Sequence, residues 1–112
     1  MDDLLRYAGQ EFKLDKKPKE SDSTLREHLQ AIAEQTGTTP EELDNPEPNL
    51  AVQHLLVIFQ QLSLSRQAGM VLNPITYSEI VAWSQLYQTR LSMWEIDVLK
   101  RIDLVFLNIQ NE

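Results

Sequence analysis

The strongest constraint on the fold is a helix-start pattern that occurs twice in the last third of the chain. It reads Ile75-Thr76-Tyr77-Ser78-Glu79-Ile80 and, 16 residues later, Leu91-Ser92-Met93-Trp94-Glu95-Ile96. In each copy a hydroxyl residue can cap the third helical amide, a glutamate can reach back to the cap, and an apolar pair can close over the entry. Because such a cap contributes about 1 kcal/mol, it fixes where a helix begins. The two copies predict a helical hairpin over residues 76–88 and 92–109.

Further helical segments are predicted upstream of this hairpin. Thr24 and Glu27 can form another capping box, and the helical stripe that follows ends at Gly37. Pro40 favours the start of a short helix, which the break over 45–48 ends. Residues 50–64 carry apolar side chains at helical spacing, so this segment is predicted to be the central helix. The sequence therefore predicts an all-α fold, a small helical bundle of three main helices plus a short helix that ends in a helical hairpin.

The length and composition favour a single domain. With 112 residues, 42% of them apolar, the chain can form one modest hydrophobic core. The first 20 residues mix a short apolar cluster with several lysines, a composition typical of a tail or docking arm. We expect residues 1–20 to be a weakly ordered N-terminal arm and residues 21–112 to be a single helical domain.

The residues needed for catalysis or metal binding are scarce. The chain has no cysteine, which excludes a disulfide, a thiolate nucleophile and a cysteine-based zinc site. His28 and His54 are the only histidines, and neither has the spacing of a metal-binding motif. Glu79 and Glu95 could be imagined as a carboxylate pair, but their capping positions explain them better. We expect no catalytic, cofactor-binding or metal site, and hence no enzyme.

The net charge of −7 is concentrated in one segment. Residues 20–48 hold one basic and eight acidic groups, and such a domain should repel nucleic-acid phosphates. We expect no direct nucleic-acid binding. No apolar run approaches the roughly 20 residues that cross a bilayer, and the acidic start differs from a secretory signal. The sequence therefore predicts a soluble protein inside a cell, without membrane contact.

Several apolar residues are candidates for binding a protein partner. Tryptophan is enriched in binding hot spots as well as in cores, and the apolar stripe on 92–109 is too wide for one partner helix. The connector over 65–74 is unusually apolar for a loop. The predicted partner-binding or core residues are Trp83, Trp94, Phe106, Met70, Val71 and Leu72.

A block in the C-terminal half resembles a known family. It runs Leu72-Asn73-Pro74-Ile75-Thr76-Tyr77-Ser78-Glu79-Ile80, continues with Ala82-Trp83, Leu86 and Leu91, and closes with Trp94-Glu95, Leu99, Ile102-Asp103 and Leu107. Upstream, Glu34-Gln35-Thr36-Gly37 and Pro40-Glu41-Glu42-Leu43 extend the likeness, which covers about residues 20–110. The pattern resembles the tail-assembly chaperone-like proteins of tailed bacteriophages and prophages, encoded near the tape-measure gene. Where that family often has a tryptophan in the central helix, this chain offers Leu56 or Phe59.

The resemblance implies a non-catalytic protein in the cytoplasm of the bacterial host. It would bind phage tail proteins, either the tape-measure protein or the tail-tube protein, and help them assemble. Self-association is left open, and so is retention in the finished virion as a structural tail component. The alternative from another class is an acidic phage-encoded inhibitor that mimics nucleic acid to block a basic host protein, with Glu41, Glu42 and Asp44 as its acidic surface.

Overall fold

The computed structural model describes residues 2–18, 21–66 and 72–111, and all the regular elements in these ranges are helices. The all-α prediction is confirmed. The predicted arrangement of three main helices plus a short one is not, because the described ranges hold five α-helices and one 3-10 helix. In chain order these are α1 (Asp2–Asp15), α2 (Leu25–Thr36), the 3-10 helix η1 (Glu41–Leu43), α3 (Leu50–Leu64), α4 (Tyr77–Leu86) and α5 (Met93–Gln110).

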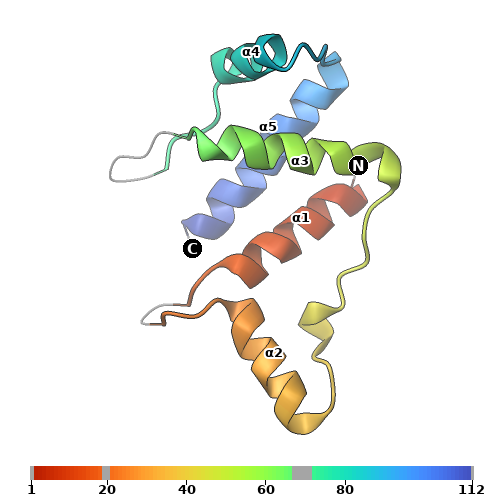
Figure 1. The fold of residues 1–112 in the computed structure, drawn as a ribbon, viewed down its shortest axis with the longest axis vertical. Helices are drawn as coiled ribbons and strands as arrows, with labels where there is room; N and C mark the ends of the chain where they lie inside the picture. The colour runs from red at the N-terminus through yellow and green to blue at the C-terminus, as the bar shows by residue number, and fades with distance from the viewer. Residues whose placement is uncertain (1, 19–20, 67–71, 112) are drawn as a thin grey trace.

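The helices form a flat molecule with two unequal parts. Its extents are 48 × 35 × 21 Å, so it is only about two helices thick. Figure 1 shows α3, α4 and α5 gathered at one end, α2 and η1 at the other, and α1 between them. We call α1, α3, α4 and α5 the body and residues 21–48 the acidic segment.

The helix starts follow the capping signals in the sequence. The full capping box is present at Thr24 and at Ser92, where the hydroxyl accepts from the third helical amide and the glutamate accepts from the cap. At Thr76 the hydroxyl accepts from the amide of Glu79 at 3.2 Å, but the reciprocal bond is not formed. The capping residues therefore mark where each of these helices begins.

The core lies where α5 crosses α1 and α3. The α5 side chains of Val98, Leu99 and Ile102 are fully buried and meet Leu55, Phe59 and Leu62 of α3. The wide stripe predicted on 92–109 is thus covered by two helices. The predicted hairpin of 76–88 and 92–109 is not confirmed as a packing unit: α5 packs chiefly on α1 and α3, and α4 packs on α3.

Helix α1 supplies the second cover for α5. Residues 2–15 form a helix that packs on α5, in the part of the chain for which the composition suggested a weakly ordered arm. Its Leu4, Ala8 and Leu14 side chains are buried. Leu4 and Ala8, one helical turn apart on α1, belong to the same core cluster as Val98 and Ile102 of α5. A Cβ on Gly9 would lie 3.3 Å from Cγ1 of Val105, so the glycine lets α1 and α5 approach closely. The division of the chain into domains at residue 20 stays a prediction.

The segment that enters α4 is held by a buried ion pair. Asp103 of α5 accepts from Arg66 at 2.5 Å with one carboxylate oxygen and from the amide of Ile75 at 2.9 Å with the other. Both charged side chains are at most 5% exposed. Lys100 also donates to the carbonyl oxygen of Ile75. These contacts set the position from which α4 starts.

Helix α2 contrasts with the body because none of its residues is buried. Its predicted apolar stripe includes Ile32, which is 46% exposed. It is attached to α1 through polar contacts, in which Arg26 pairs with both Glu11 and Asp15. The helix exists where the capping box predicted it, but its stripe does not enter the core.

Candidate protein-binding surfaces

Trp83 lies in a groove between α3 and α4, where its side chain is half-buried. Its indole Nε1 donates a hydrogen bond of 2.9 Å to Oε1 of Gln61 on α3. Its ring stacks on Tyr87 with 5.0 Å between the ring centroids. Trp83 is therefore held in place by α3 while part of its side chain stays accessible. The groove is lined by Gln61, Leu62, Ser65, Glu79, Ala82, Trp83, Leu86 and Tyr87.

A run of exposed apolar side chains extends from α4 to the start of α5. We call it the apolar segment 77–94, and it comprises Tyr77, Val81, Leu86, Tyr87, Met93 and Trp94. These are six of the eleven exposed large apolar side chains in the described ranges. Sequence reasoning missed most of them, although α4 carries apolar residues on every face and one neighbouring helix can cover only one. Exposed large apolar side chains that gather on a surface commonly mark a protein-binding site, and these six are concentrated in one short stretch of the chain.

Trp94, another predicted contact residue, lies in the first turn of α5 and is 49% exposed. The turn is held against α3 because Glu95 contacts Nε2 of His54 at 2.8 Å. The pKa of the Glu95 carboxyl is lowered, first by the hydrogen bond from the backbone amide of Ser92 and then by His54, although burial opposes the shift. Among the described residues no ring contact joins Trp83 to Trp94, so the two tryptophans are separate features.

Phe106 lies in an aromatic cluster of the body. Its ring centroid is 5.2 Å from that of Phe12 and 5.7 Å from that of Phe59, in edge-on geometry. The guanidinium of Arg66 lies 4.9 Å from the centroid of the Phe106 ring. This placement joins α1, α3 and α5 through aromatic contacts, and it favours a core role for Phe106.

The remaining predicted residues fall in two places. Met70 and Val71 lie outside the described residues, and Leu72 is half-buried. Glu41, Glu42 and Asp44 are all exposed, in or directly after η1. The backbone of this segment is anchored on α1, since the side chain of Gln10 donates to the carbonyl oxygen of Glu42 at 2.9 Å. The acidic side chains themselves therefore remain in solvent.

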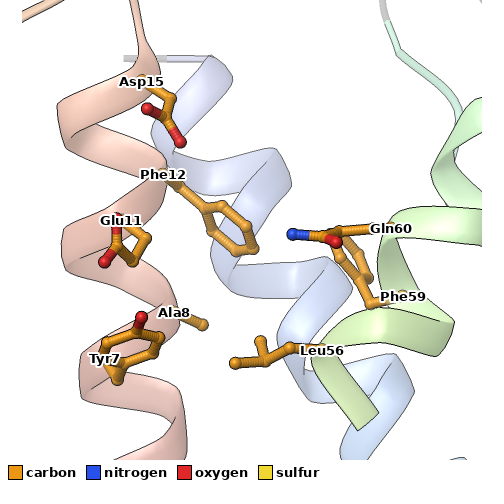
Figure 2. Close-up of a pocket in the computed structure, with 8 residues that line it drawn as sticks. All are labelled: Tyr7, Ala8, Glu11, Phe12, Asp15, Leu56, Phe59 and Gln60. Atoms are coloured by element: carbon orange, nitrogen blue, oxygen red, sulfur yellow. The ribbon is translucent and has the colours of Figure 1, made fainter. Parts of the chain in front are cut away.

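A second groove runs between α1 and α3. Its cavity has a volume of about 260 Å³ and is lined by Tyr7, Ala8, Glu11, Phe12, Asp15, Leu56, Phe59 and Gln60. Figure 2 shows Phe12 and Leu56 pointing into the space between the two helices, with Glu11 and Asp15 following each other along α1. Its apolar part is thus bordered by carboxylates. No sequence signal singled out this groove, because α1 was expected to be weakly ordered.

The described residues hold no group of three or more histidine, cysteine or acidic side chains that could bind a metal ion. In the same ranges, no helix combines the length and apolar character that crossing a membrane requires. His28 of α2 contacts Ser21 at 3.0 Å, and His54 of α3 contacts Glu95 of α5. The two histidines therefore lie in different parts of the molecule.

The described residues thus form an all-helical body that leaves large apolar side chains of α4 and of the first turn of α5 in solvent. A family model described as phage tail assembly chaperone matches residues 32–108, and the chain belongs to this family. The match begins near the end of α2 and extends almost to the end of α5, whereas α1 lies before it. It confirms the resemblance inferred from the block over 72–107. No curated protein and no solved structure matches the chain.

Membership in this family supports a role in tail assembly and interaction with phage tail proteins. It also suggests a protein that works without catalysis. The match gives no support to the alternative of an acidic inhibitor that mimics nucleic acid.

Proposed function

We propose that this protein is a non-catalytic chaperone of phage tail assembly that acts in the cytoplasm of the bacterial host. It binds the tape-measure protein or the tail-tube protein through the apolar segment 77–94. The observation that carries the proposal is the exposure of six large apolar side chains inside the region that the family model matches. The proposed contact residues include three that were chosen from the sequence, Trp83, Trp94 and Leu72. They also include two that the structure leaves exposed, Leu86 and Tyr87.

The energetic argument starts from Leu86. Its side chain is 81% exposed, so nearly all of its apolar area is left in water by the chain itself. Burying such a side chain under a partner stabilises the complex by about 2 kcal/mol. Several side chains of this kind together provide enough apolar area for a specific interface, with the half-buried Trp83 as a rigid aromatic anchor.

A chaperone role follows from what such an interface does for the partner. Tail proteins that later polymerise expose apolar or unpaired surfaces beforehand, and these surfaces promote aggregation. A small helical protein that covers them keeps the partner competent for assembly. Release must follow when the partner polymerises, so we expect an interface of moderate size that is not obligate.

The test is copurification from cells that coexpress the tagged protein with the tape-measure and tail-tube proteins of the same phage. The variant is Leu86→Glu, and the matched control is Leu50→Glu. Both leucines are 81% exposed, so neither substitution disturbs the core, but Leu50 lies at the start of α3 outside the apolar segment 77–94. We expect Leu86→Glu to weaken binding by about tenfold or more and Leu50→Glu to bind like the unchanged protein.

Two results would contradict the proposal. Failure of both tail proteins to copurify with the unchanged chain would remove the chaperone role itself. Equal binding by Leu86→Glu and Leu50→Glu would keep the role but move the contact surface away from α4. Peptide mass spectrometry of purified virions then tells whether the protein leaves the tail after assembly, as a chaperone does, or stays as a structural component.

A further inference from the structure

The groove between α1 and α3 continues beyond the region drawn in Figure 2. Tyr7, Leu56 and Gln60 also line a second cavity, together with Glu47, Pro48, Gln53, His54 and Val57. The two cavities therefore form one groove along α3 from Gln53 to Gln60. At 1.5 Å per residue these seven steps span about 10 Å, or two turns of a helix.

The floor of the groove is apolar and incompletely covered. Phe59 and Ala8 are buried beneath it, whereas Phe12 and Leu56 are only half-buried. The rings of Phe12 and Phe59 are 5.4 Å apart between centroids, so the floor is a packed aromatic surface and not a gap in the core. An apolar side chain placed here would contact Phe12 and Leu56 without any rearrangement of the body.

The edges of the groove are acidic. Glu11 and Asp15 lie at one end and Glu47 at the other, and no lysine or arginine is among the described residues that line it. Arg26 of α2 already pairs with both Glu11 and Asp15, which leaves an excess of negative charge. Burial raises the pKa of the Tyr7 hydroxyl, and the charges of Glu11 and Glu47 raise it further. Tyr7 lines both cavities, so it lies between the carboxylates of the two ends.

The shape of the groove favours a helix as its occupant. The regular elements of the described ranges are all helices, so strand addition to a sheet edge is not the recognition mode on offer here. A helix laid between two helices can insert one apolar side chain into the groove and direct side chains one turn away toward its ends. Lysine or arginine at those positions would meet the carboxylates.

We propose that the groove between α1 and α3 receives an amphipathic helix of the tail protein that the chaperone binds. An apolar side chain of this helix packs on Phe12 and Leu56, and lysine or arginine side chains one turn away pair with the carboxylates at the ends. This inference rests on the proposed function and adds a second contact to the apolar segment 77–94. It requires that the partner helix carry apolar and basic side chains on the same face.

The first measurement is site-specific photo-crosslinking in the coexpression system. A photo-reactive phenylalanine analogue replaces Gln60, which lines the groove and is exposed, and the control position is Gln35, an exposed glutamine on α2. We expect position 60 to crosslink to a segment of the tape-measure or tail-tube protein with apolar residues at helical spacing and flanking lysine or arginine. Position 35 should give no such product.

The second measurement compares opposite charges at one position. Gln60→Lys should weaken binding about fivefold, because the new ammonium group competes for the carboxylates, whereas Gln60→Glu should bind as well as the unchanged chain or better. The difference should shrink in high salt. Gln35→Lys is the matched control and should bind normally.

The outcomes separate the two proposals. If a tail protein copurifies but position 60 gives no crosslink, or crosslinks to a segment without basic residues, the groove proposal is overturned and the proposed function stands. Equal binding by Gln60→Lys and Gln60→Glu has the same meaning. If neither tail protein copurifies with the unchanged chain, both proposals fall.

Discussion

Helix α1 and helix α2 show how differently a helix can be attached to the same molecule. Helix α1 buries Leu4, Ala8 and Leu14 and packs most extensively on α5, whereas α2 buries nothing. Yet α2 has the complete capping box, and its sequence pattern is the clearer of the two. A cap fixes where a helix starts, but only apolar burial decides whether the helix belongs to the core.

The body and the acidic segment are therefore held together by different kinds of contact. The body carries the core, the buried ion pair, the groove at Trp83 and most of the groove between α1 and α3, so its stability depends on packing. The acidic segment is joined to α1 by polar contacts at its two ends, through Arg26 at one and through Gln10 and Asn45 at the other. Polar contacts at the surface contribute little individually, so the acidic segment should open at lower cost than the body.

The largest expected effect concerns the buried ion pair of the body. Asp103→Ala leaves the buried guanidinium of Arg66 without its carboxylate and frees the amide of Ile75. We expect the free energy of unfolding to fall by about 3–5 kcal/mol, measured by urea denaturation. The matched control is Asp97→Ala, an exposed aspartate on the same helix, with a change of at most about 0.5 kcal/mol. A small change at Asp103 would mean that the pair does not hold the entry to α4.

The next prediction tests the comparison of α1 with α2 directly. Leu4→Ala removes a side chain that is 1% exposed in the core and should cost about 3 kcal/mol of stability. Ile32→Ala removes an apolar side chain from α2 that is half in water, and it should cost less than about 1 kcal/mol. Both values come from the same denaturation experiment. Equal costs would show that α2 belongs to the cooperative core, contrary to the contrast drawn here.

The same contrast explains what the sequence could and could not predict. Hydroxyl caps act within four residues, so the starts of α2, α4 and α5 could be located from Thr24, Thr76 and Ser92. Burial depends on partners far along the chain, so the packing of Leu4 against α5 could not be inferred. The spacing of Leu4 and Ala8 indicates a helical face. The lysines that follow α1 nevertheless give the first 20 residues a composition typical of a weakly ordered arm.

The candidate binding residues also differ in how far the sequence could predict them. Trp83 and Trp94 could be chosen from residue type alone, and both are at least partly accessible in the structure. Phe106 was chosen for the same reason, but it meets Phe12, whose helix was not expected. The groove between α1 and α3 could not be predicted, because it exists only when α1 packs beside α3.

The smallest expected effect is a dependence of stability on pH that differs between the two regions. The pKa of the Glu95 carboxyl is lowered, chiefly by the hydrogen bond from the Ser92 amide, and the pKa of Glu27 is lowered, chiefly by the corresponding bond from Thr24. A carboxyl with a lowered folded-state pKa stabilises the fold fully above its ordinary pKa, here 4.5. That contribution is lost as the pH falls through the lowered value.

Only one of these carboxyls should matter for global unfolding. Glu95 begins a core helix and contacts His54 of α3, so Glu95→Gln should lower stability at pH 7 by about 1 kcal/mol and flatten the decline below pH 4.5. Glu27 caps a helix without buried residues, so Glu27→Gln should fray α2 and leave the global transition unchanged. Urea denaturation across pH 3–7 measures the first effect, and amide hydrogen exchange in α2 measures the second. If Glu27→Gln changed the global transition as much as Glu95→Gln, the acidic segment would have to unfold together with the body.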